Sequence, residues 1–283
     1  HVFMPQPARP ALITDAIETD RATTVFLPPT VIYMMMAEED LSKRDFKSLK
    51  HVIIGGAAMR ATEIKRGLPL FNNALETCYG QTEVPQIVTV MRARDWIDND
   101  HRLSSCGHAT DRCDVRVIDK DGNFLPTGQA GEIVIKSELM MKGYLDMPEA
   151  TAETIKDGWL YTGDVAEIEE DGFIYIKDRI RDMIVTGGFN VFPSDVEAVL
   201  GQHPSVKECV VFGLPDDKWG EAVQAAVEVH AGQPADEADI IQYVKSRLDS
   251  VKAPKRVHFV NELPRSPVGK VLRREAKAQF QES

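Results

Sequence analysis

The chain has 283 residues, of which 27% are charged and 43% hydrophobic, as is usual for a soluble globular protein with room for two domains. Its net charge of -11 argues against a nucleic-acid backbone or an anionic membrane as the main partner. No apolar run approaches the length of a membrane span. The four cysteines form no Cys-x-x-Cys pair and fit no common zinc spacing, which favours reduced thiols and a cytoplasmic location.

The first third of the chain alternates strand and helix patterns. Strands are expected at residues 23–27, 51–54 and 75–79, with one helix capped by Thr30 and another beginning near residue 62. Small-residue loops follow the second and third strands. This pattern predicts part of an α/β domain over residues 1–110, with ligands bound at the carboxyl ends of the strands.

Short strands separated by turn signals occupy the next segment. Asp121-Gly122 and Asp171-Gly172 mark hairpin turns between them. We therefore expect a small antiparallel β-barrel-like subdomain of the same domain over residues 111–178.

The pattern changes again after a short segment at residues 179–182, which we expect to be a hinge. Ser194-Asp195-Val196-Glu197 has the pattern of a capping box that begins a helix ending near Gly201. Strands and helices alternate from there to the end of the sequence. A compact α+β C-terminal domain over residues 183–283 is predicted.

One acidic and one basic residue end neighbouring strands of the predicted subdomain. Asp164 follows a glycine turn, and Arg179 ends the next strand. Antiparallel pairing would bring the carboxylate and the guanidinium to one sheet edge. Such a pair suits a ribose and its phosphate, but it is equally consistent with a plain surface ion pair.

Six segments in one order resemble the adenylate-forming superfamily of acyl-CoA synthetases, carrier-protein adenylation domains and luciferase. The segments are Gly55-Gly56-Ala57-Ala58, Tyr79-Gly80-Gln81-Thr82-Glu83, Gly131-Glu132-Ile133 with Gly143-Tyr144, Tyr161-Thr162-Gly163-Asp164, Asp178-Arg179 with Gly187-Gly188, and Pro264-Arg265-Ser266-Pro267-Val268-Gly269-Lys270. The resemblance implies that a carboxylic acid attacks the α-phosphate of ATP to give an acyl-adenylate and pyrophosphate. A thiol, usually that of coenzyme A, then displaces AMP.

The resemblance also implies roles for the nucleotide-side residues. Residues 79–81 would pack on the adenine, Thr82 would donate to a phosphate, and Glu83 would bind Mg²⁺, which prefers oxygen ligands. Residues 55–57 would form the floor of the adenine and acyl pockets. Without the other segments, Glu83 would read as a solvated loop carboxylate and residues 55–58 as a helix-entry turn.

Further implied roles lie around the hinge. Asp164 would bind both ribose hydroxyls with Arg179 beside it, and Arg181 would be the pivot. Lys270 would stabilise the charge that develops on the α-phosphate and the attacking carboxylate. The alternative for Lys270 is a surface lysine in a basic tail.

Coenzyme A has its own implied contacts in the C-terminal domain. Gly187, Gly188 and Phe189 would line the path of the pantetheine arm. Trp219 would pack on coenzyme A, although a half-buried surface tryptophan fits the sequence equally well. Lys252 and Lys255 are candidate partners for its phosphates.

The chain begins with His1 and has no match to the family's Ser/Thr/Gly-rich phosphate loop. We therefore expect that it is part of a longer acyl-CoA synthetase, that a missing N-terminal half is its partner, and that the piece alone is inactive. A carrier-protein adenylating or luciferase-like enzyme, and a non-catalytic nucleotide-binding fragment, remain alternatives. A homodimer is left open, and the identity of the acid is not assigned.

Overall fold

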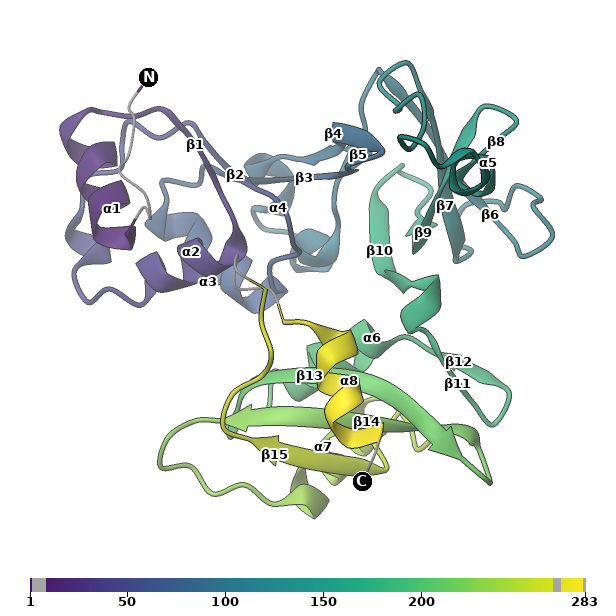
Figure 1. Ribbon diagram of the computed structural model, residues 1–283. Coiled ribbons are helices and arrows are strands. Elements are labelled where there is room, and N and C mark those ends of the chain that lie inside the picture. The colour runs from purple at the N-terminus through teal and green to yellow at the C-terminus, as the bar shows by residue number, and fades with distance from the viewer. Residues whose placement is uncertain (2–8, 267–270, 282–283) are drawn as a thin grey trace. The chain divides into compact units, whose positions relative to one another are not determined.

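The computed structural model describes residues 1, 9–266 and 271–281, except for the side chain of Gln86. The chain divides into two compact units (Figure 1). We call residues 1–162 and 166–176 the N-terminal unit, and residues 163–165 and 177–283 the C-terminal unit. Within the described ranges, no helix combines the length and apolar character that crossing a membrane requires.

A mixed five-stranded sheet organises the first part of the N-terminal unit. Its strands, in spatial order, are β1 (Thr24–Leu27), β2 (His51–Ile54), β3 (Leu75–Gln81), β4 (Val84–Met91) and β5 (His108–Ala109). The first three run parallel, and β4 and β5 run antiparallel to their neighbours. Helices α1 (Pro10–Thr19), α2 (Pro29–Met36) and α3 (Ala61–Leu70) share one apolar core with this sheet. The predicted α/β character of this part is observed, with a mixed sheet.

A second sheet holds the residues for which a barrel was predicted. It consists of β6 (Cys113–Ile118), β7 (Gly131–Ser137), β8 (Ile155–Lys156), β9 (Trp159–Ile168) and β10 (Ile174–Arg179), with α5 at Pro148–Thr154. The order β10-β9-β7-β6, with β8 beside β9, is open, so among the described strands the barrel is not confirmed. Strands β9 and β10 contribute residues to both units.

The C-terminal unit is a sheet with helices on both faces. Its strands are β11 (Ile184–Thr186), β12 (Phe189–Val191), β13 (Val206–Asp216), β14 (Gly220–Val229) and β15 (Arg256–Val260). Side chains that alternate along β13 face opposite sides. Val211 packs in the core that includes residues of α6 (Pro193–Leu200) and α7 (Glu237–Arg247), while Phe212 packs against α8 (Arg273–Gln281). The predicted α+β character of this part is observed.

Two helix starts differ from the sequence prediction. Helix α2 begins at Pro29, with Pro28 and not Thr30 at the N-cap. Helix α6 begins at Pro193 with Phe192 at the N-cap, so Ser194 does not form the predicted capping box. In both cases a proline at the first helical position fixes the backbone where its missing N–H costs no hydrogen bond.

Candidate functional site

The segment that carries Thr82 and Glu83 is a tight antiparallel turn. Strand β3 continues through Gln81, and β4 returns from Val84, so Thr82 and Glu83 form the turn itself. The sequence predicted a strand-to-loop exit here and missed β4. The turn leaves Thr82 exposed and Glu83 half-buried.

A tyrosine from the next sheet region holds the Glu83 side chain. Tyr144 Oη donates to Glu83 Oε1 over 2.6 Å, and the amide of Met141 donates to the Glu83 carbonyl over 2.7 Å. This bond to the carboxylate raises the pKa of Tyr144, so the phenol remains a donor. Within the described residues Glu83 Oε2 makes no hydrogen bond. The sequence named Tyr144 within a motif but assigned it no role.

The remaining adenine-side candidates lie on β3, and one of them, Gln81, contacts the first half of β9. Gln81 Nε2 donates to the carbonyl of Thr162 over 3.1 Å and lies 3.4 Å from Tyr79 Oη. Gly80 lies between Tyr79 and Gln81 within β3. Gln81 therefore contacts β9 within the N-terminal unit.

The two glycines after β2 stand where a side chain is unfavourable, Gly55 against the Phe26 ring and Gly56 in the left-handed region. A Cβ on Gly55 would lie 2.4 Å from Cζ of Phe26, and Gly56 has a φ of +84°. Ala57 follows them and is half-buried. The contact with Phe26 and the positive φ of Gly56 both favour small residues here, and the role of residues 55–57 as the floor of the adenine and acyl pockets stays a prediction.

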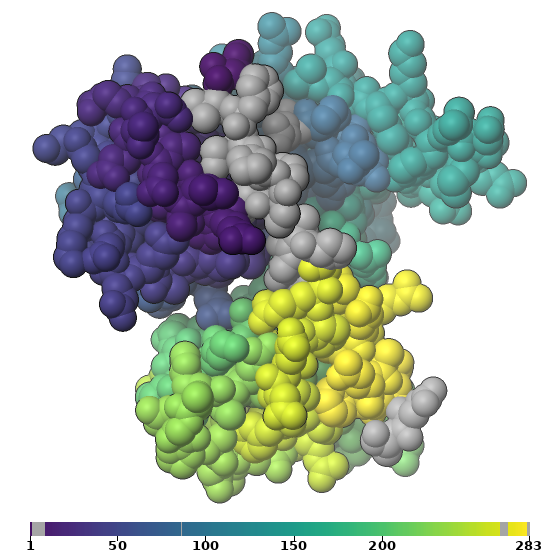
Figure 2. All heavy atoms as spheres, turned by 60° about the vertical axis from the view of Figure 1, so that its left-hand side comes forward, coloured from purple at the N-terminus to yellow at the C-terminus, as the bar shows by residue number. Residues whose placement is uncertain are grey.

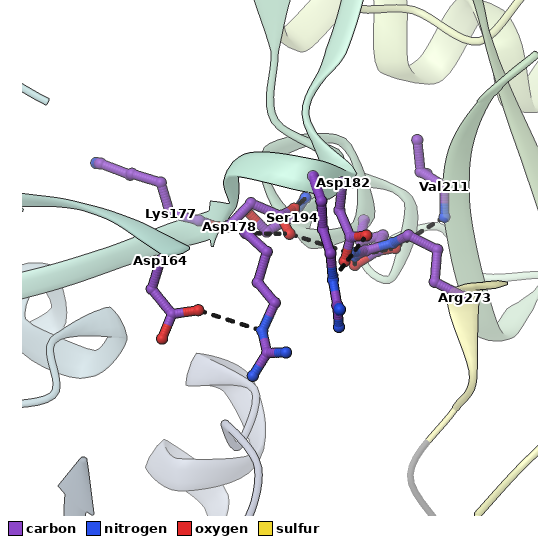
Figure 3. Close-up of polar contacts among 10 residues, drawn as sticks. Asp164, Lys177, Asp178, Asp182, Ser194, Val211 and Arg273 are labelled. Carbon is purple, nitrogen blue, oxygen red and sulfur yellow. Dashed lines mark hydrogen bonds and ion pairs between the residues drawn. The ribbon is translucent and has the colours of Figure 1, made fainter. Parts of the chain in front are cut away.

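Asp164 and Arg179 meet on the neighbouring strands β9 and β10, but only Arg179 ends its strand as predicted, because β9 continues past Asp164 to Ile168. Arg179 Nε lies 3.2 Å from Asp164 Oδ1, and the two side chains are 45% and 7% exposed, respectively (Figure 3). Both residues belong to the C-terminal unit. A nearly buried carboxylate beside a half-exposed guanidinium can accept hydroxyl hydrogens on one side while the cation reaches a phosphate.

The coenzyme A candidates Gly187, Gly188 and Trp219 lie together. The glycines, with φ of +58° and +83°, form a two-residue turn between β11 and β12, a geometry that favours glycine at both positions. The amide of Gly187 donates to the Trp219 carbonyl over 2.8 Å, and a Cβ on Gly187 would lie 3.0 Å from the indole. Phe189 and Trp219 are both exposed. The indole therefore packs on the turn and is 39% exposed, with Lys218 Nζ 4.7 Å from the ring centre.

The two candidate phosphate-binding lysines have different surroundings. Lys255 Nζ lies 6.0 Å from the centre of the Trp219 ring and donates to the carbonyls of Ser250 and Ala253. Burial lowers the pKa of Lys255. Lys252 Nζ instead lies 3.4 Å from Asp195. Lys255 is thus grouped with the tryptophan, while Lys252 is engaged by an acid.

The structure shows fewer contacts for the two remaining candidates, Arg181 and Lys270. Arg181 lies in the short helix Ile180–Asp182 with its side chain 73% exposed. Lys270 lies outside the described residues. Arg273, which the sequence analysis did not single out, is engaged by three carboxylates near the predicted hinge (Figure 3). A lone arginine in a basic helix gives no sequence signal for such a role.

Two family models match the chain, one over its N-terminal part and one over its C-terminal part. The model described as AMP-binding enzyme matches residues 1–145. The chain belongs to this family. The model for the C-terminal domain of AMP-binding enzymes matches residues 195–270. Membership in the adenylate-forming superfamily, expected from the six motifs, is confirmed.

Relatives within the AMP-binding enzymes match nearly all of this chain. It is 40% identical to the medium/long-chain-fatty-acid–CoA ligase FadD8 of Mycobacterium tuberculosis, over 96% of this chain and 49% of FadD8. It is 35% identical to the fatty acid–[acyl-carrier-protein] ligase ScoC of Streptomyces coeruleorubidus, over 94% of this chain and 51% of ScoC. The solved structure of the amide bond synthetase McbA from Marinactinospora thermotolerans superposes with a TM-score of 0.91 at 34% identity, covering 96% of this chain and 56% of McbA. The chain thus spans about half the length of the relatives it matches.

Proposed function

We propose that the whole protein is an ATP-dependent, AMP-forming carboxylic acid–CoA ligase. The observation that carries this proposal is the 40% identity to a fatty-acid–CoA ligase across 96% of the chain. Two residue sets support the same proposal. The Asp164–Arg179 pair suits a nucleotide, and Trp219 with the Gly187–Gly188 turn suits a thiol carrier. Fatty acids are the first substrate class to test.

In this proposal, the residues of the chain act on ATP and the acid in separate ways. Asp164 accepts hydrogen bonds from the ribose hydroxyls, and Arg179 approaches the phosphate. Thr82 donates its hydroxyl to a phosphate oxygen. The carboxylate attacks the α-phosphate, and the bond to the β-phosphate breaks to release pyrophosphate. Lys270, outside the described residues, would supply a positive charge there that stabilises the developing negative charge. AMP then leaves as the thiol attacks the carbonyl carbon of the acyl-adenylate.

Glu83 is the proposed metal-binding residue. A Mg²⁺ ion in such sites is held by one or two carboxylates together with substrate phosphates, and it neutralises phosphate charge. Glu83 fits this donor set, because Tyr144 orients one carboxylate oxygen and the other makes no hydrogen bond within the described residues. Tyr144 then fixes the direction in which the second oxygen points.

The thioester step is assigned to residues of the C-terminal unit. Gly187, Gly188 and Phe189 would border the pantetheine arm, and Trp219 would contact coenzyme A. Lys255 is the better candidate for a phosphate contact, because it lies near Trp219 and its partners are neutral carbonyls, whereas the charge of Lys252 is paired with Asp195. We keep the predicted hinge at residues 179–182, with Arg181 as pivot, as part of this proposal.

A different acceptor is the second candidate function. ScoC and McbA, which the chain resembles at 35% and 34% identity, are named for an acyl-carrier protein and for amide bond formation, respectively. The adenylating step would be the same, and only the nucleophile that displaces AMP would differ. An exposed Trp219 beside Lys255 favours coenzyme A, because an aromatic face and a cation suit an adenine and its phosphates.

The test is a panel of acids and acceptors with the whole protein. AMP release with a fatty acid and coenzyme A, and much slower release with a carrier protein or an amine, would support the proposal. Preference for the carrier protein or the amine would favour the second function. We also propose that this chain alone catalyses no ATP–pyrophosphate exchange, because it spans only half of its relatives, and measurable exchange would overturn that part.

A further inference from the structure

A single guanidinium at the start of α8 binds three carboxylates. Arg273 Nη1 lies 3.0 Å from Asp178 Oδ1 and 3.0 Å from Asp182 Oδ2, and Nη2 lies 3.0 and 3.1 Å from the two oxygens of Glu197 (Figure 3). The Arg273 side chain is only 21% exposed. We call these four residues the Arg273 cluster. All of them belong to the C-terminal unit, so the cluster is internal to it.

The cluster holds both ends of the segment from Asp178 to Asp182. Asp178 Oδ1 also accepts from the backbone amide of Arg179 over 2.8 Å, and its Oδ2 accepts from the amide of Ser194 over 2.9 Å. The Asp178 carboxylate therefore fixes the backbone of Arg179. Arg179 in turn reaches Asp164 with its side chain.

The third carboxylate ties this segment to the body of the unit. Glu197, on α6, accepts from the amide of Val211 on β13 over 2.8 Å (Figure 3). Ser194, at the start of the same helix, donates its hydroxyl to the carbonyl of Lys177. Arg273 thus connects the Asp178–Asp182 segment to α6 and, through Glu197, to β13, which pairs with β14 in the sheet.

Charge and geometry favour arginine at this position. Burial lowers the pKa of Arg273, but the carboxylates of Glu197 and Asp178 outweigh it, and the net pKa is raised. Its Nε is buried without a partner among the described residues. The structure tolerates this orphaned donor, and both ends of the planar fork then face carboxylates on different elements. A lysine has one charged point and cannot bridge them in the same way.

The residues before Arg273 are also held. The amide of Leu272 donates to the Pro264 carbonyl over 2.8 Å, and Val271 forms a bridge with Arg265. Arg265 pairs in turn with the buried Glu228 over 3.1 Å. Arg273 therefore follows directly on an anchored stretch of backbone, which keeps its guanidinium in register with the carboxylates.

We propose that Arg273 is a positioning residue for the adenylating reaction. It fixes Asp178, and through Asp178 it sets where Arg179 meets the nucleotide. The inference rests on the proposed function and adds to it a residue that does not touch the substrate. A competing explanation is that the cluster only stabilises the fold, in which case its three carboxylates should affect activity only as far as they affect stability.

Substitutions of the cluster residues in the whole protein distinguish a positioning role from a purely stabilising one. Arg273→Met and Asp178→Asn should each raise the KM for ATP in pyrophosphate exchange by about tenfold, the effect of one lost charged hydrogen bond. The double variant should be no worse than either single variant, because both act on one connection. Glu197→Gln should lower the Tm but change the KM for ATP by less than about twofold, a difference too small for a lost charged bond. Arg274→Met is the matched control: Arg274 is the exposed neighbour on α8, a helix that forms part of the visible surface (Figure 2), and it should change neither quantity.

Two results would overturn the proposal. One is a KM for ATP that follows the Tm across all variants, with Glu197→Gln as damaging as Asp178→Asn. The other is additive effects of Arg273→Met and Asp178→Asn. Hydrogen exchange of the amides at residues 179–182 is a readout that does not depend on turnover. It should speed up in Arg273→Met and not in Arg274→Met, and equal exchange would also overturn the proposal. If the whole protein without any substitution showed no pyrophosphate exchange, the proposed function would be contradicted. Hydrogen exchange would then be the measurement that tests whether Arg273 positions residues 179–182.

Discussion

The substitution Asp164→Asn separates a ribose-binding carboxylate from a plain hairpin ion pair. It keeps the shape of the side chain and removes its charge. A hydrogen bond to a charged group contributes about 1.5–3 kcal/mol. Since each factor of ten in affinity corresponds to about 1.4 kcal/mol, the dissociation constant of ATP should rise by about 10–100-fold. Stability should change little, because the partner Arg179 is 45% exposed and an ion pair with an exposed member contributes at most about 1 kcal/mol.

The assay is ATP binding to the whole protein by calorimetry, alongside thermal unfolding. Asp114→Asn is the matched control, since Asp114 Oδ1 lies 2.8 Å from Arg116 Nε in an exposed pair on β6. The control should leave the ATP affinity unchanged. If Asp164→Asn binds ATP as tightly as the unchanged protein while its Tm falls, the pair is structural and the reasoning is refuted.

Three further predictions concern other parts of the chain. Tyr144→Phe should raise the Mg²⁺ concentration for half-maximal adenylation by about tenfold, with the rate restored at high Mg²⁺; Mn²⁺ titration of the ATP complex checks this, and an unchanged midpoint would contradict it. Gly107→Ala should destabilise this chain by more than about 2 kcal/mol in denaturant unfolding, because its Cβ would lie 1.9 Å from the Val90 carbonyl oxygen at a φ of +90°. Gly122→Ala, with φ of +85° and open space, is its control and should cost about 1 kcal/mol; equal losses would rule out the clash. Burial raises the pKa of Glu197, and removing its cation in Arg273→Met should raise that pKa further. A raised folded-state pKa gives stability that is present at low pH and lost as pH rises, so the Tm deficit of this variant should be larger at about pH 8 than at about pH 5, and a deficit independent of pH would argue against it.

Much of the fold was predictable because local sequence and tertiary structure agree. The buried strand His51–Ile54 and the helix that ends at Gly201 follow from apolar pattern and turn residues alone. Strand β4 was missed because the short turn at Thr82 and Glu83 carries no glycine or asparagine signal. The Ser194 capping box was wrong because Pro193 starts the helix earlier and Glu197 is recruited by Arg273. A competing long-range contact of this kind leaves no local trace.

The candidate site likewise contains residues that the sequence predicted and residues that it did not. Motifs placed Asp164 and Arg179 close together on neighbouring strands, and the structure brings them within 3.2 Å, although Asp164 lies inside β9 and not at its end. The contact of Tyr144 with Glu83 joins residues 61 positions apart, and that of Arg273 with Asp178 joins residues 95 apart. Such partners depend on how distant segments fold together. Single-sequence patterns, which describe neighbours along the chain, do not contain that information.

The central claim is that the whole protein joins a carboxylic acid to coenzyme A through an acyl-adenylate. The most direct measurement is AMP release by the purified whole protein with ATP, Mg²⁺ and a medium- or long-chain fatty acid, with and without coenzyme A. We predict acyl-CoA and AMP in equal amounts only when coenzyme A is present. Formation of ADP instead of AMP, or no acyl-CoA with any acid of the panel, would contradict the account.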